Sequence, residues 1–78
     1  MIELEQDILI YALRYALGRQ TYAVNDVIMA IRDNWKNLSD NVKLIIREDI
    51  RKHLLNLNQD FDTCYNDWKN LYKELNNA

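Results

Sequence analysis

Residues 8–19 read Ile-Leu-Ile-Tyr-Ala-Leu-Arg-Tyr-Ala-Leu-Gly-Arg, and this stretch indicates the fold class. At the roughly 100° per residue of an α-helix, one side of it holds four apolar residues: Leu9, Leu13, Ala16 and Leu17. The opposite side is apolar as well, with Ile8, Tyr11, Ala12 and Tyr15. A helix that is apolar nearly all round has to be enclosed by other elements. We therefore expect residues 3–17 to form the central helix of an all-α, compact bundle of about four helices.

Composition supports one helical domain over residues 1–78. The chain has no Pro and one Gly, whereas an all-β chain needs turn residues at regular intervals. Its 49% hydrophobic and 28% charged residues are typical of a globular protein. The N-terminus lacks the basic region of a signal peptide, and the longest apolar run, Ile8 to Leu13, is too short to span a bilayer. We expect a cytoplasmic protein with no membrane segment.

Three further helices follow from the apolar spacing and the capping residues. Gly18 is expected to end the first helix, and Thr21, Ser39 and Asp60 to cap the second, third and fourth. The apolar stripe of the second helix comprises Val24, Val27, Ile28, Ile31 and Trp35. That of the third comprises Val42, Ile46, Ile50, His53, Leu54 and Leu57. That of the fourth comprises Phe61, Cys64, Tyr65, Trp68, Leu71, Tyr72 and Leu75. Each stripe predicts a core-facing side.

The sequence offers little for catalysis or metal binding. A single His53 and a single Cys64 do not make a zinc site, and a lone cysteine in an aromatic stripe usually acts as a small hydrophobe. The oxygens of residues 58–62 begin like a calcium loop, but Thr63 and Lys69 replace its required Gly and Glu. We expect no enzyme, no cofactor, no metal ligand and no catalytic residue.

Lys43, Arg47 and Arg51 recur every four residues, which places like charges on one side of the third helix. Such pairs cost about 0.2–0.5 kcal/mol each. We expect compensation across the hairpin of the third and fourth helices from an acidic row, namely Asp60, Asp67 and Glu74. The alternative is that the basic row contacts RNA phosphates or an acidic partner.

Two pairs of apolar residues lie off the main stripes and are candidate contact residues. Tyr22 and Met29 share a side of the second helix with Asp26 and Asp33, and Arg19 borders it. This set is the predicted partner-binding site. Leu44 and Leu55, three turns apart on the third helix, are the predicted contact of a symmetric homodimer. Burial against a neighbouring helix is the alternative for both pairs.

Residues 12–22, Ala-Leu-Arg-Tyr-Ala-Leu-Gly-Arg-Gln-Thr-Tyr, resemble a group of short proteins from phages and prophages of low-GC Gram-positive bacteria. Those proteins carry the same stretch, an amphipathic helix, and then an Ile-x-x-Asp-Ile segment, which here is Ile46-Arg-Glu-Asp-Ile50. The resemblance covers residues 8–50. It implies binding more than catalysis, because small acidic phage proteins of this size are often inhibitors of bacterial defence, anti-CRISPR proteins among them.

Two functions follow as expectations. The first is stoichiometric inhibition of a host defence protein, such as a CRISPR effector nuclease, by protein–protein contact. The alternative is an RNA- or DNA-binding regulator that uses five basic residues: Arg14, Arg19, Lys43, Arg47 and Arg51. The net charge of −2 favours the first, because nucleic-acid binders usually carry a stronger basic bias.

Overall fold

The protein is described by a computed structural model that covers residues 3–17, 22–56 and 64–77, with residues 3, 4, 22, 23 and 56 described by their backbone alone. The helices are α1 (Glu3–Ala16), α2 (Tyr22–Asn34), the 3-10 turn η1 (Trp35–Asn37), α3 (Asp40–Asn56) and α4 (Tyr65–Asn77). Within these ranges there is no strand, so the predicted all-α bundle is confirmed. None of these helices combines the length and the apolar character that a membrane crossing requires.

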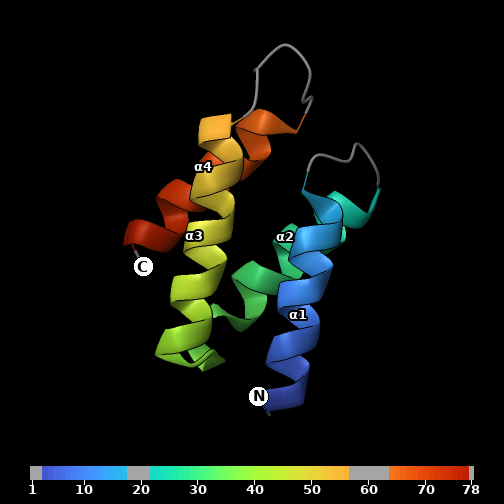
Figure 1. Cartoon of the computed structure of the whole chain (residues 1–78), viewed down its shortest axis with the longest axis vertical. Coiled ribbons are helices and arrows are strands. Elements are labelled where there is room, and N and C mark those ends of the chain that lie inside the picture. Colours follow the sequence, from blue (N-terminus) through green and yellow to red (C-terminus); the bar gives the residue numbers. More distant parts are fainter. Residues whose placement is uncertain (1–2, 18–21, 57–63, 78) are drawn as a thin grey trace.

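Successive helices alternate in direction along the long axis of the bundle (Figure 1). The main contacts of α1 are with α2 and α3, and those of α4 are with α3 and α2. As predicted, α3 and α4 form an antiparallel hairpin. The bundle therefore has two outward-facing junctions that matter below, one between α2 and α4 and one between α3 and α4.

The predicted apolar stripes form the core. All five residues of the second stripe are buried, including Trp35, which lies in η1 just beyond the end of α2. The side chains with almost no solvent exposure come from all four helices: Leu13, Val24, Ile31, Ile46, Ile50, Trp68 and Leu71. Periodicity alone was enough to identify them, because a helix in a bundle buries the side that carries its apolar residues.

 

One expectation about α1 is wrong, because the helix is not enclosed on all sides. The core side of α1 is confirmed, since Leu9, Leu13 and Ala16 are buried, as predicted. On the opposite side, however, Ile8 is 58%, Tyr11 70% and Tyr15 61% exposed. The physical reason is that, among the described helices, α1 packs mainly against α2 and α3, so its outer side faces solvent although its residues are apolar.

The start of α3 is fixed by the cap that the sequence predicts. The Ser39 hydroxyl accepts a hydrogen bond from the backbone N–H of Val42 at 3.3 Å, and the Ser39 carbonyl accepts one from Lys43 at 3.0 Å. The backbone N–H of Ser39 in turn donates to Oε1 of Gln6 at 2.8 Å. Gln6 is buried on the core side of α1, so this bond ties the beginning of α1 to the beginning of α3.

Several sequence predictions lie outside the described residues. They concern the ends of helices, the last residue of the third stripe, the first of the fourth and one partner-binding residue, namely Gly18, Thr21, Asp60, Leu57, Phe61 and Arg19. The side chain of Tyr22 is also outside the description, although its backbone begins α2.

Candidate protein-binding surfaces

The predicted partner-binding side of α2 is exposed. Asp26, Met29 and Asp33 succeed one another at spacings of three and four, which aligns them along one side of the helix. All three are exposed, and Met29 keeps 57% of its surface in solvent. A flexible, polarizable methionine beside two carboxylates can act as an apolar anchor within a negatively charged surface. Binding by these residues stays a prediction.

Met29 also lies at a shallow groove of about 250 Å³ between α2 and α4. Its lining residues come from both helices: Asn25, Ile28, Met29, Arg32, Asp67, Asn70 and Glu74. Arg32 donates two hydrogen bonds to Glu74, at 2.7 and 3.0 Å, and so links the two walls. The contribution of α4 to this surface was not predicted from the sequence, because the spacing of Asp67 and Glu74 does not show which neighbouring helix they face.

The expectation that Glu74 compensates the basic row is therefore wrong, since Glu74 pairs with Arg32 of α2. Asp67 likewise lines the groove between α2 and α4. The rotation of α4 about its axis turns this acidic side toward α2 and away from α3. The third member of the predicted acidic row, Asp60, lies outside the described residues.

The basic row finds other partners. Lys43 Nζ lies 5.7 Å and Arg47 Cζ 5.6 Å from the centroid of the Trp35 ring, within the range of cation–π contacts. Arg51 donates to Glu48 on the preceding turn, at 3.0 and 2.8 Å. The like charges are thus relieved by an aromatic ring from η1 and by a carboxylate within α3.

The ion pair within α3 gives a prediction for pH titration. The hydrogen bonds from Arg51 lower the pKa of Glu48. A pKa that is lower in the folded than in the unfolded state contributes stability above the unfolded pKa, and this is lost as the pH falls through the folded pKa. We expect Arg51→Gln to raise the titration midpoint of Glu48 in an NMR experiment. Lys36→Gln, which removes a charge from η1, should leave it unchanged; equal midpoints in all three proteins would contradict the pairing.

The predicted dimer residues do not belong to one surface feature. Leu44 is 56% and Leu55 70% exposed, and the Glu48–Arg51 ion pair lies on the helix between them. Leu55 lines the groove described next, whereas Leu44 does not. A symmetric dimer through both leucines stays a prediction.

A second groove lies between α3 and α4 and has a volume of about 470 Å³. We call it the α3–α4 groove, and it is lined by Arg51, Leu54, Leu55, Tyr65, Lys69, Tyr72, Lys73, Asn76 and Asn77. Apolar and aromatic side chains form most of its wall, and three basic residues line it as well; none of the described residues that line it carries a carboxylate. Volumes of this size with few polar groups are typical of binding sites. The spacing of Tyr65 and Tyr72 predicts that they belong to the core, but both are only half-buried.

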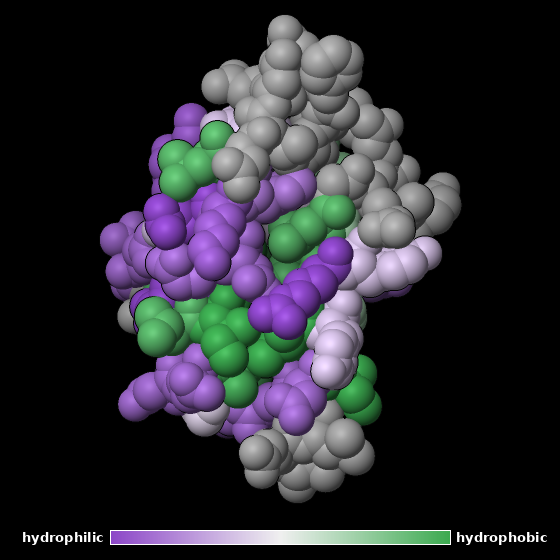
Figure 2. Space-filling view, viewed as in Figure 1, coloured by the Kyte–Doolittle hydropathy of each residue, from purple (hydrophilic) through white to green (hydrophobic). Residues whose placement is uncertain are grey.

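The surface is mixed rather than uniformly polar. Apolar side chains reach the surface on the face that α1 and α3 present, between hydrophilic side chains (Figure 2).

An ion pair joins α1 to α3. Arg14 Nε donates to Asp49 at 2.8 Å, and this contact raises the pKa of Arg14. Arg14, one of the residues of the nucleic-acid alternative, is thus engaged within the molecule.

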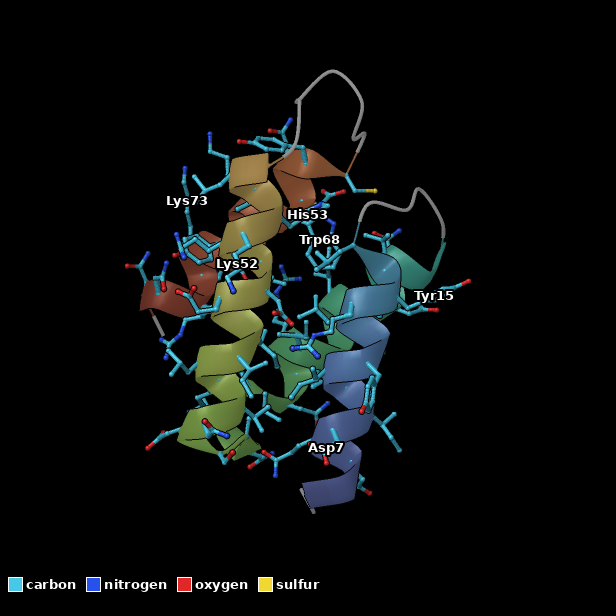
Figure 3. All side chains as sticks on the ribbon, viewed as in Figure 1. Asp7, Tyr15, Lys52, His53, Trp68 and Lys73 are labelled. Carbon is cyan, nitrogen blue, oxygen red and sulfur yellow. The ribbon has the colours of Figure 1, made fainter. Side chains whose placement is uncertain are left out.

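His53 and Cys64, the residues weighed for catalysis, are both half-buried. The His53 ring stands edge-on to Trp68, with the ring centroids 6.4 Å apart and the planes at 77° (Figure 3). Nε1 of the buried Trp68 has no hydrogen-bond acceptor within the part of the chain that the structure describes. In that same part, no group of three or more His, Cys, Asp or Glu residues is arranged to hold a metal ion.

Comparisons with known proteins add no family to this description. A scan against protein-family models and searches of the curated proteins and of the solved structures found no match.

Proposed function

We propose that the protein acts by stoichiometric binding to another protein. The supporting observation is the exposed side of α2, where Met29 lies at the α2–α4 groove beside exposed carboxylates. An apolar anchor supplies binding energy in a protein interface, and surrounding charge steers association and selects the partner. Three carboxylates around Met29 are unengaged by any salt bridge among the described residues: Asp26, Asp33 and Asp67.

In its more specific form, the proposal is inhibition of a host defence protein by a phage-encoded protein. Nucleic-acid enzymes, CRISPR effector nucleases among them, bind their substrates in basic clefts, and a negatively charged surface with a central anchor is complementary to such a cleft. The resemblance of residues 8–50 to short phage and prophage proteins supports the same proposal. The inhibitor would occupy a surface that the target needs, and one copy would inactivate one target.

The test is titration of purified CRISPR effector nucleases with the protein, with DNA cleavage as the measurement. We expect cleavage to stop near an equimolar ratio. Met29→Arg with Asp33→Arg should weaken inhibition at least tenfold, because the anchor becomes charged and the sign of the surface is reversed. Leu44→Arg with Asp40→Arg is the matched control, since Leu44 and Met29 are 56% and 57% exposed.

Circular dichroism should show that both double variants remain helical. We call the protein with Met29→Arg and Asp33→Arg the α2 variant. If it still inhibits as the wild type does, the role of this surface is contradicted. The absence of inhibition by the wild-type protein would contradict the choice of target. In that case, the broader proposal is tested by capturing partners from a bacterial lysate with the wild-type protein and, in parallel, with the α2 variant. The proposal requires a partner that binds the wild type and not the α2 variant.

The nucleic-acid alternative has less support. Its described basic residues all contact groups within the molecule: Arg14 with Asp49, Arg51 with Glu48, and both Lys43 and Arg47 with Trp35. Binding through phosphates would give an affinity that falls steeply with salt in a mobility-shift experiment.

A further inference from the structure

The α3–α4 groove is positively charged and apolar at once. Lys69 and Lys73 are exposed, and neither forms an ion pair with a described residue. The apolar part of the groove wall comes from Leu54 and Leu55 of α3 and from Tyr72 of α4. The occupant that this chemistry favours is a helix with large apolar side chains and a neighbouring negative charge. On α4 the groove extends from Tyr65 to Asn77, about 18 Å at the rise of an α-helix.

The outer side of α1 has the complementary properties. Ile8, Tyr11 and Tyr15 are exposed and follow at spacings of three and four, so they form one stripe about 10 Å long, which we call the α1 stripe. Asp7 is exposed beside it, and Glu5 lies one turn before Ile8. The α1 stripe is thus an acidic, aromatic helix surface that is short enough to fit along the groove.

The two surfaces lie on different sides of the molecule. Figure 3 shows Tyr15 projecting from α1 at one side of the bundle and Lys73 projecting from α4 at the other. A chain therefore cannot place its own α1 stripe in its own groove, because α1 is fixed against α2 and α3. Only a second molecule can bring them together.

We propose that the α1 stripe of one copy of this chain docks in the α3–α4 groove of another copy. Tyr11 and Ile8 supply the apolar contact with the groove wall, and Asp7 lies near the ammonium groups of Lys69 and Lys73. One contact covers two exposed apolar surfaces that the single chain leaves in solvent.

This contact joins two different surfaces, so it is heterologous, and each bound copy still presents one free stripe or groove. The assembly therefore grows head to tail as the concentration rises. It differs from a symmetric dimer through Leu44 and Leu55, which would stop at two copies. Because one stripe is smaller than the roughly 800 Å² per partner of a standard interface, we expect a dissociation constant on the order of micromolar to millimolar.

The test uses two complementary double variants in analytical ultracentrifugation. Lys69→Glu with Lys73→Glu reverses the charge of the groove but keeps the stripe. Ile8→Ser with Tyr11→Ser removes the stripe but keeps the groove. We expect the wild type to exceed the dimer mass at about 1 mM, near the upper limit of the expected range. Each variant alone should remain monomeric, and an equimolar mixture should form a 1:1 dimer that grows no further.

Matched controls separate this contact from general effects of charge or hydrophobicity. Lys36→Glu with Lys52→Glu makes the same charge change away from the groove, and Met29→Ser with Leu44→Ser removes two apolar side chains of similar exposure. Both controls should associate as the wild type does, and circular dichroism should show that all the variants are helical.

Leu55→Glu and Leu44→Glu provide an independent pair. Association should weaken at least tenfold in the first, because Leu55 lines the groove, and remain unchanged in the second. A wild type that stays monomeric at about 1 mM would overturn the proposal. It would also be overturned by a mixture of the two double variants that forms no dimer, or by loss of association on Leu44→Glu.

Discussion

Replacing Trp68 with Ala should destabilise the protein by about 3–5 kcal/mol, the range for removal of a buried aromatic side chain. Trp68 has no exposed surface and is the largest of the fully buried side chains. It comes from α4 and stands against His53 of α3, so its loss leaves a cavity in the hairpin. For a domain of this size, such a loss should lower the melting temperature by more than about 12 °C.

Urea unfolding followed by circular dichroism measures this change. Asn66→Ala, at an exposed position two residues earlier, should stay within about 0.5 kcal/mol of the wild type. Trp68→Phe should fall between the two variants, because it keeps an aromatic ring and removes the buried Nε1 donor that lacks an acceptor among the described residues. A loss below about 1 kcal/mol for Trp68→Ala would mean that α4 is not packed into the core.

Replacing Leu13 with Ala should cost about 2–5 kcal/mol. Leu13 is fully buried on the side of α1 that faces α2 and α3, so truncation removes apolar contacts and leaves a cavity. The same unfolding experiment applies. Its control is Tyr11→Ala on the same helix. Because the Tyr11 side chain is 70% exposed, its removal should change the stability of the monomer by less than about 0.5 kcal/mol.

The contrast between Leu13 and Tyr11 is also a test of how α1 sits in the bundle. Similar losses for both variants would mean that α1 is covered on both sides, as its sequence alone suggests. A loss below about 1 kcal/mol for Leu13→Ala would mean that α1 is peripheral to the core.

Helical periodicity was sufficient to predict most of the core. The stripe from Val24 to Trp35 is buried throughout, and the Ser39 cap begins α3 as expected. Both features are local, since a stripe depends on the spacing of residues along one helix and a cap on a hydroxyl within a few residues of the backbone that it binds.

The candidate sites were predicted less completely. The spacing placed Met29 and Asp26 on one side of α2, off its main stripe, and left burial of Met29 against a neighbouring helix as the alternative; the structure shows both residues exposed. It did not indicate that Asp67 and Asn70 of α4 line the same groove as Met29. It also did not indicate that Tyr72 and Lys73 form a groove with Leu55. Each groove is made by two helices, so its wall combines residues that are distant in the sequence.

The sequence by itself determined the all-α class, the number of helices and the side that each helix buries. Only the tertiary structure decided which charges of different helices meet, with Glu74 on Arg32 of α2 and Asp49 of α3 on Arg14 of α1. It also decided that Tyr11 is exposed, and where the α3–α4 groove opens. The reason is that burial of a stripe follows from the spacing within one helix, whereas charge pairs and grooves depend on how each helix is rotated and which helices it packs against. Those rotations are set by the packing of the whole core at once, and no single stretch of the chain encodes them.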